Sequence, residues 1–478
     1  MSVKTSLGWM ALAQSCGFLL QFAASVVLAR YLSPYETGVY AVALATVGLL
    51  SLMEALGLQS LIIREQNLTD EVQATAFTIN GCIAIALALS IEGLSAFGSA
   101  FLHDEGVQRV LGVLALTPLL GIPSFLPSAR LERAGRFKAV ALVGTASNVI
   151  GTAATITFAV RGFSYMSIAY AQWVGAAAHM LMSIIIGREY LSFRLGLAAW
   201  RRIGDFGFQM LAVSGITAAS QRLSDIILGR LLGLSALGIY NRANGLNGLI
   251  WNNIHLVVAR VVFVDYAALH RHGVPLRDRY IRTLEIMTAT LWPAFAGLAV
   301  LARPFIAFLY GERWVPAASP LLFLAIASMI LVSISMTWEL FAATGELRIQ
   351  TRIEVIRAPL ALLAFVAGCT VSISAAAAAR VLDAVFAFFL YRSHLNRMTG
   401  TSLADFWPIY CKGAVLTALA ITPALLVTMS FQPASIPPAF AVGTILFGIA
   451  LWVCGLLALR HPLIQEIRTT ARSIFRIA

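Results

Sequence analysis

Long apolar segments follow one another along almost the whole chain, separated by short polar connections. Most are close to the roughly 20 residues that a helix needs to cross the hydrocarbon of a bilayer. We therefore predict a transmembrane helix in each, and we read the first as a retained span rather than a cleaved signal peptide. The segments fall at 7–29, 39–58, 74–98, 110–127, 140–160, 165–187, 203–228, 237–263, 284–302, 318–340, 353–371, 374–391, 408–428 and 438–459.

Composition supports this interpretation of the pattern. Hydrophobic residues make up 59% of the 478-residue chain, charged residues only 12%, and the mean hydropathy is +0.83. A soluble protein carries about twice that charged share. These values exclude a set of soluble domains and indicate a polytopic integral membrane protein.

The spacing of the segments predicts an all-α membrane protein of about 14 transmembrane helices, arranged as two six-helix lobes and two additional helices. The first lobe would occupy residues 1–187 and the second 203–392. A cytoplasmic linker over 188–202, with four arginines, separates them, and residues 393–478 hold the two extra spans and a cytoplasmic tail.

The two lobes resemble each other in sequence. A shift of 200 residues aligns Arg30–Tyr40 with Arg230–Tyr240, so that Arg, Leu, Gly and Tyr coincide, and Gly135 matches Gly345 at an offset of 210. Because each lobe holds an even number of spans, both copies run in the same direction. Such a parallel repeat is typical of alternating-access transporters, which bind substrate between their lobes.

The basic residues predict the orientation. The net charge is +12, but the basic residues are spread over short loops, which favours a topological signal over nucleic-acid binding. Under the alternating assignment, 22 lysines and arginines lie on the side of the N-terminus and 6 on the other side. We therefore expect both termini in the cytoplasm.

Several chemistries lack a sequence signal. No GxxxxGK[ST] loop is present to bind nucleotide phosphates. Neither an HExxH nor a CxxC motif is present to suggest a metal site. No outer loop is long enough to suggest a glycan polymerase or transferase. We therefore predict a transporter that is not an enzyme and that needs neither a cofactor nor a metal.

Three stretches carry a resemblance to a known family. They are Val27–Tyr40 in the first loop, Arg222–Ala243 around the seventh and eighth spans, and Phe308–Pro320 in an outer loop. Together they resemble the polysaccharide and oligosaccharide flippases (Wzx-like) of the multidrug/oligosaccharidyl-lipid/polysaccharide exporter superfamily.

The resemblance implies transport of undecaprenyl-pyrophosphate-linked oligosaccharides across the bacterial inner membrane, for lipopolysaccharide O-antigen, capsule or exopolysaccharide synthesis. It also implies membrane lipids, a coupling proton or sodium ion, and the polymerase and glycosyltransferases of the pathway as partners. A peptidoglycan-precursor or multidrug exporter of the same fold is the first alternative. A membrane glycan polymerase or transferase is the second.

The deepest ionisable residues are the candidate site. Arg222 and Asp225 are expected in the seventh span, Arg242 in the eighth, and Arg380 and Asp383 in the twelfth. Both Arg–Asp pairs have i,i+3 spacing, which places the partners on one helical face. The arginines would bind pyrophosphate while the aspartates hold them or bind a coupling cation; a structural ion pair is the competing interpretation.

Three further cations, Arg260, Arg357 and Lys412, lie near the predicted cytoplasmic ends of their spans. We expect them to extend towards the membrane surface as long basic side chains do there. A cytoplasmic ring of cations would alternatively help to load a lipid pyrophosphate, so Arg260 and Arg357 are also candidate substrate-binding residues.

Overall fold

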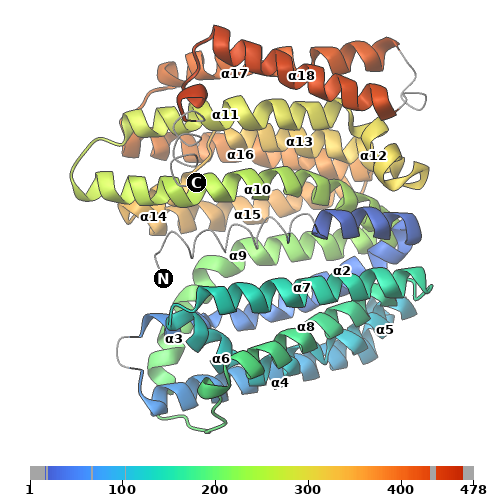
Figure 1. The fold of residues 1–478 in the computed structure, drawn as a ribbon, viewed down its shortest axis with the longest axis vertical. Helices are drawn as coiled ribbons and strands as arrows, with labels where there is room; N and C mark the ends of the chain where they lie inside the picture. The colour runs from blue at the N-terminus through green and yellow to red at the C-terminus, as the bar shows by residue number, and fades with distance from the viewer. Residues whose placement is uncertain (1–16, 18–19, 66–67, 103, 431–437, 467–478) are drawn as a thin grey trace. The chain divides into compact units, whose positions relative to one another are not determined.

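In a computed structural model of the chain, the described residues are 17, 20–65, 68–102, 104–430 and 438–466. Helices occupy most of these ranges, which contain no β-strand (Figure 1). This confirms the predicted all-α fold. Residues 7–16, 18 and 19 of the predicted first span, 7–29, lie outside the described residues, and residues 20–31 are helical.

Within the described ranges, nine stretches are long and apolar enough to cross a membrane. They are Pro34–Ile63, Asp70–Ala96, Glu105–Arg133, Phe137–Val160, Met166–Ile186, Arg277–Val300, Glu312–Thr344, Ile373–Thr399 and Leu403–Ser430. Val442–Ala458 is apolar but shorter. The predicted seventh, eighth and eleventh spans form helices outside this set, so the total of fourteen remains a prediction.

The chain divides by its internal contacts into two compact units, Met1–Gly238 and Ile239–Ala478. Helix α9 (Trp200–Leu232), which the sequence assigns to the second lobe, packs in unit 1 against α2 (Pro34–Leu50) and η1 (Ser51–Leu56). This division follows from which helices pack together and does not test whether the two lobes arose by duplication. The lobe boundaries drawn from the sequence repeat therefore remain a prediction.

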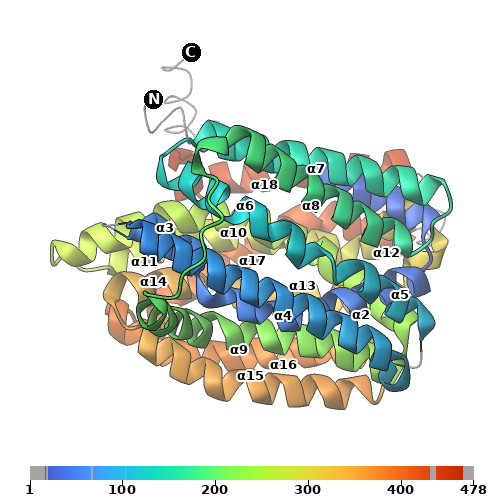
Figure 2. The same cartoon turned by 90° about the horizontal axis from the view of Figure 1, so that it is seen from below.

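Unit 1 is built of packed helices. Helices α7 (Phe137–Val160) and α8 (Met166–Ile186) make an extensive contact and lie side by side (Figures 1 and 2). The other elements between α2 and α9 are α3 (Leu58–Arg64), α4 (Asp70–Leu102), α5 (Glu105–Leu114), α6 (Thr117–Arg133) and η2 (Arg188–Tyr190).

The first-loop stretch is the N-terminal cap of α2. The Ser33 side chain accepts a hydrogen bond from the Glu36 backbone N–H at 3.2 Å, and the Ser33 N–H donates to the Glu36 carboxylate at 2.7 Å. Pro34 follows as the first helical residue. This reciprocal capping box satisfies two backbone donors that the helix leaves unpaired, so the motif starts the helix locally.

The repeated glycines of the two matching stretches lie at a close backbone crossing within unit 1. A Cβ on Gly38 of α2 would lie 1.8 Å from the carbonyl oxygen of Leu234. A Cβ on Gly238, its repeat equivalent, would lie 1.9 Å from the carbonyl oxygen of Pro34. Only glycine permits this approach, which explains why both copies of the motif carry it.

Unit 2 surrounds a large buried core with aromatic members that include Tyr266, Tyr280, Phe295, Phe341 and Phe406. Helix α10 (Leu234–Arg271) begins in unit 1 and continues into unit 2. The following elements are α11 (Arg277–Val300), α12 (Ala302–Tyr310), η3 (Glu312–Ala317), α13 (Ala318–Val332), α14 (Thr337–Thr344), α15 (Leu347–Cys369), α16 (Ile373–Thr399), α17 (Leu403–Ser430) and α18 (Pro438–Ala458).

The predicted span 318–340 is not one continuous helix, because it breaks between α13 and α14. Met336 adopts a left-handed conformation with φ of 61°. The Ser333 carbonyl at the break accepts a hydrogen bond from the Tyr410 hydroxyl at 3.0 Å, and the Trp292 indole donates to the Met329 carbonyl at 2.8 Å. Side chains of neighbouring helices thus satisfy backbone groups freed by the break, as an apolar environment requires.

Candidate functional site

A cluster of charges joins α15 to α16 in unit 2. Nη1 of Arg357 lies 3.2 Å from Oδ1 of Asp383, and Nε lies 3.2 Å from Oε1 of Glu354. The Tyr391 hydroxyl donates to the same Glu354 oxygen at 2.5 Å. The side chains of Arg357, Asp383 and Glu354 are only 18%, 13% and 17% exposed. The cluster holds two carboxylates and one guanidinium.

The cluster lies far from the helix ends. Arg357 follows the start of α15 by ten residues, and Asp383 follows the start of α16 by ten residues. At about 1.5 Å per residue, each is about 15 Å along its helix. Helix α15 begins six residues before the predicted span 353–371. The expectation that Arg357 extends towards the membrane surface stays a prediction.

Asp383 thus has an ion-pair partner on the neighbouring helix that its spacing from Arg380 did not predict. The guanidinium of Arg380 lies over the Phe365 ring of α15, 4.4 Å from the ring centroid. A cation over an aromatic face is stabilised by the ring quadrupole. Arg380 consequently packs on an aromatic side chain that the sequence did not single out.

Arg242 is held between aromatic rings. Its guanidinium carbon lies 4.7 Å from the centroid of Tyr310 and 4.5 Å from that of Trp314, and both rings are buried. These residues belong to the outer-loop stretch Phe308–Pro320 that carries part of the family resemblance. The stretch supplies a cation–π cage for an arginine on α10, a role that its sequence alone does not indicate.

In unit 1, Arg222 lies on α9 where that helix meets α2. A Cβ on Gly48 of α2 would lie 2.6 Å from Nε of Arg222, so the absence of a side chain there makes room for the guanidinium. Asp225 is partly buried on the same helix. Arg260 belongs to α10, and its side chain lies outside the described residues.

Lys412 pairs with a carboxylate of a neighbouring helix. Its ammonium lies 2.9 Å from Oε1 of Glu285, a buried residue of α11, and Nε2 of His461 lies 3.8 Å from the same oxygen. Sequence analysis missed Glu285, Glu354 and Tyr391 as partners. Only Glu354 left a local signal, its i,i+3 spacing from Arg357; the others come from different helices.

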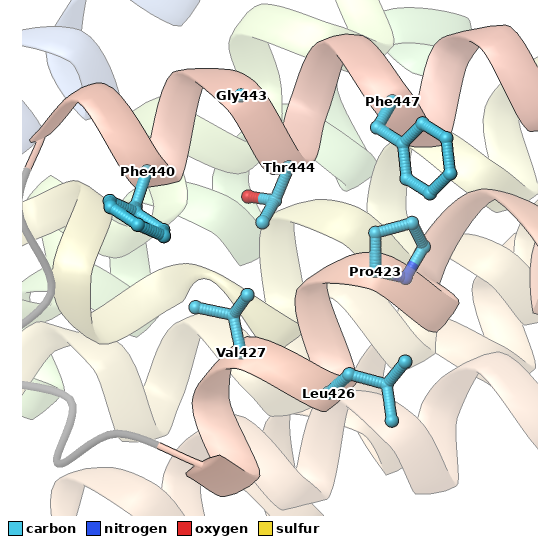
Figure 3. A pocket seen from close by; sticks show the side chains of 7 residues that line it. All are labelled: Pro423, Leu426, Val427, Phe440, Gly443, Thr444 and Phe447. Atoms are coloured by element: carbon cyan, nitrogen blue, oxygen red, sulfur yellow. The ribbon is translucent and has the colours of Figure 1, made fainter.

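Helices α17 and α18 line an open apolar depression of about 530 Å³ (Figure 3). Its lining is aromatic and aliphatic apart from Thr444: Pro423, Leu426, Val427, Phe440, Gly443, Thr444 and Phe447. Such a surface suits the hydrocarbon chains of lipids. The described residues contain no group of three His, Cys, Asp or Glu side chains arranged to hold a metal ion.

Two relatives with known names match about two thirds of the chain. Over 334 residues the chain is 25% identical to the succinoglycan biosynthesis transport protein ExoT of Rhizobium meliloti, covering 70% of this chain and 68% of the relative. It is 22% identical to the lipopolysaccharide biosynthesis protein WzxC of Escherichia coli, covering 64% of this chain and 63% of the relative.

Solved structures share the fold. The lipid II flippase MurJ in an inward closed conformation matches with a TM-score of 0.76, covering 95% of this chain and 99% of that one at 13% identity. An inward-facing multidrug MATE transporter matches with a TM-score of 0.62, covering 81% and 96% at 14% identity. Identities this low support the fold alone.

The family comparison covers more than half of the sequence. The family described as "Polysaccharide biosynthesis protein" matches residues 27–319, which include the first two stretches that carried the resemblance and all but the last residue of the third. This confirms the predicted membership and favours a membrane transporter over an enzyme. The chain belongs to the polysaccharide biosynthesis protein family, the polysaccharide flippase branch of its exporter superfamily.

Proposed function

We propose that the chain is a flippase that moves undecaprenyl-pyrophosphate-linked oligosaccharide repeat units from the cytoplasmic to the periplasmic leaflet by alternating access. The product would serve exopolysaccharide, capsule or O-antigen synthesis. The observation that carries the proposal is the family match over residues 27–319, together with relatives named for transport and polysaccharide biosynthesis.

The physical task fits a helical protein with charges deep in its helices. The lipid tail of such a substrate can remain in the bilayer, whereas the sugars and pyrophosphate must cross about 30 Å of hydrocarbon. Fixed cationic donors lower that barrier by replacing part of the hydration of the pyrophosphate. Arginine suits this role because its planar fork matches phosphate oxygens.

We propose that Arg222, Arg242 and Arg380 contact the pyrophosphate. Arg357 already binds two carboxylates, so we expect it to contribute mainly through the charge of the site. Arg260 remains a proposed contact on the strength of its sequence position.

The cluster of Glu354, Arg357 and Asp383 is our proposed coupling site. Two carboxylates contact the Arg357 guanidinium there, and a proton or a sodium ion bound to either carboxylate would change the charge of the site. Asp225 is the corresponding candidate in unit 1. We place the protein in the bacterial inner membrane with both termini in the cytoplasm, alongside the pathway's polymerase and glycosyltransferases.

Gene deletion tests the function. In a strain without redundant flippases, we expect the surface or secreted polysaccharide to disappear and lipid-linked repeat units to accumulate in the inner leaflet. Unchanged polysaccharide output and leaflet distribution would contradict the proposal. Proteoliposomes supplied with either lipid-linked repeat units or a peptidoglycan precursor would separate it from the precursor-exporter alternative, which the shared MurJ fold leaves open.

Variants of Arg380 test the proposed contact. Arg380→Lys keeps the charge but loses the planar fork, so we expect partial export, while Arg380→Ala should abolish export at normal abundance. The exposed Arg348→Ala serves as a control on the neighbouring helix. Near-normal export by well-expressed Arg380→Ala would remove this residue from the site.

A further inference from the structure

The linker between η2 and α9 contacts the first part of α4 within unit 1. The Gly196 N–H donates to the Thr78 hydroxyl at 3.0 Å, and the Ala199 N–H donates to the Thr75 hydroxyl at 3.3 Å. Residues 191–197 have no regular secondary structure. Two of the linker's backbone donors are thus satisfied by side chains of the adjacent helix, which permits irregular backbone to enter a less polar environment.

Packing brings the linker close to the surface of that helix. The ring of Phe193 meets the ring of Phe77 edge to face, with centroids 5.9 Å apart. A Cβ on Gly196 would lie 3.3 Å from the side chain of Ala74, so a larger residue there would crowd the helix. The linker is therefore seated on α4 rather than looping freely away from it.

The contact falls inside a candidate span. Asp70–Ala96 contains 27 residues, and at about 1.5 Å per residue it measures about 40 Å, close to the thickness of a bilayer with its headgroups. Thr75 and Thr78 lie about 8 Å and about 12 Å along the helix from Asp70. With Asp70 at the cytoplasmic surface, the linker reaches the boundary between headgroups and hydrocarbon.

A row of apolar side chains points outward at this level. Phe193, Leu195 and Leu197 are 63%, 77% and 57% exposed, and Trp200 at the start of α9 is 55% exposed. In an extended segment, alternate side chains point to the same side. Exposing such a row to water is unfavourable, whereas insertion at the acyl boundary would bury it, and tryptophan favours that boundary.

The positive charges beside the row indicate what kind of lipid it meets. Arg188, Arg194 and Arg201 are exposed; Arg194 pairs with Asp70 at 3.0 Å, and Arg201 lies 5.5 Å from the Trp200 ring centroid. Basic residues near a membrane surface are attracted to anionic lipids by about 1 kcal/mol each.

We propose that residues 188–201 form an interfacial anchor in the cytoplasmic leaflet. The apolar row enters the acyl boundary, and the three arginines contact anionic phospholipid headgroups. The linker, expected from the sequence to be a cytoplasmic connection, is in this proposal a lipid-binding surface. The partner is the bilayer itself, because the row lies alongside a helix that crosses it.

Depth-dependent quenching tests the apolar half of the anchor. The full-length protein, with its native cysteines replaced by serine, would carry Leu195→Cys labelled with bimane in phosphatidylcholine/phosphatidylglycerol vesicles. Matched controls are Ile85→Cys, an exposed position deeper on α4, and His272→Cys in the exposed loop between α10 and α11.

We expect a nitroxide at carbon 5 of the lipid chain to quench the Leu195→Cys label at least about twofold more than one at carbon 12, because the linker would lie at the shallow boundary. Ile85→Cys should show the reverse order, and His272→Cys should be quenched mainly by aqueous iodide. Iodide quenching of Leu195→Cys without lipid quenching would overturn the proposal. That result is expected if the apolar row faces water or binds another protein.

Headgroup composition tests the basic half. Addition of phosphatidylglycerol to phosphatidylcholine vesicles should shift the Leu195→Cys label emission to shorter wavelength. The combined Arg188→Gln, Arg194→Gln and Arg201→Gln substitutions should remove that shift while the protein elutes as before in size-exclusion chromatography. No shift in the parent protein, or the same shift in the substituted one, would overturn the role of these arginines.

Discussion

At the residue scale, one guanidinium of α15 pairs with two carboxylates, one on α15 and one on α16. Arg357 serves two carboxylates, Glu354 and Asp383, and all three side chains are mostly buried. Removing one member of a buried ion pair costs about 3–5 kcal/mol, because the remaining charge loses its partner. The cost should therefore depend on which member is removed.

We predict that Arg357→Gln is more destabilising than Asp383→Asn. The first removes the guanidinium that both carboxylates contact, whereas the second leaves Arg357 paired with Glu354. The double variant should recover much of the stability lost in Arg357→Gln. Thermal unfolding in detergent measures this, with the exposed pair Arg109–Glu105 as a control whose loss should cost less than about 1 kcal/mol. Additive losses in the double variant would contradict the pairing.

At the element scale, the crossing at Gly38 depends on the absence of a side chain. We predict that Gly38→Ala lowers the abundance and melting temperature of the protein, because its Cβ would overlap the Leu234 carbonyl at 1.8 Å. The loss should exceed the roughly 1–3 kcal/mol typical of overpacking, since backbone must move. Gly81→Ala on α4 is the matched control, because nothing lies within 4 Å of its Cβ. Equal behaviour of the two variants would refute the crossing.

The segment after α18 adds a second element-scale effect. His461 is 1% exposed, and its Nδ1 accepts a hydrogen bond from the Leu463 N–H at 3.2 Å. Burial lowers the pKa of His461; nearby Glu285 raises it and Lys412 lowers it further. As the pH falls, His461 of the unfolded chain is therefore protonated near the ordinary histidine pKa of about 6.5. His461 of the folded chain is protonated only at lower pH. This contribution to stability is complete above about pH 6.5 and declines as the pH falls below that value.

We predict that the melting temperature falls between pH 7.5 and pH 5.5, and that His461→Gln reduces the fall. His272→Gln, in an exposed loop, should leave the fall unchanged. Melting curves of the three proteins at both pH values provide the measurement. An undiminished pH dependence in His461→Gln would show that other groups cause it.

At the scale of the whole molecule, topology is the main open prediction. Helix α8 has 21 residues, about 32 Å at 1.5 Å per residue, and connects the loop at Arg161 to Arg188. Because this length spans the hydrocarbon, reporter fusions after these two arginines should report the periplasm and the cytoplasm respectively. The same compartment for both fusions would contradict the assignment of both termini to the cytoplasm.

The sequence by itself determined the class of protein and its family. Apolar segments of membrane-spanning length must form helices that satisfy their own backbone hydrogen bonds in lipid, so an all-α fold follows from composition and spacing. The capping box of Ser33 and Glu36, with Pro34 as the first helical residue, is also local in sequence, although our predictions did not name it. The order of three short stretches was enough to indicate the family that the profile over 27–319 confirms.

Only the tertiary structure decided which charges meet. The i,i+3 rule describes one helix surface, so it linked Asp383 to Arg380, whereas the Arg357 that pairs with it is 26 positions away on an adjacent helix. The cage of Tyr310 and Trp314 around Arg242, and the seating of the linker on Thr75 and Thr78, likewise join distant segments. Periodicity gives each helix a face but not its neighbour, because the identity of the neighbour depends on how all the helices pack.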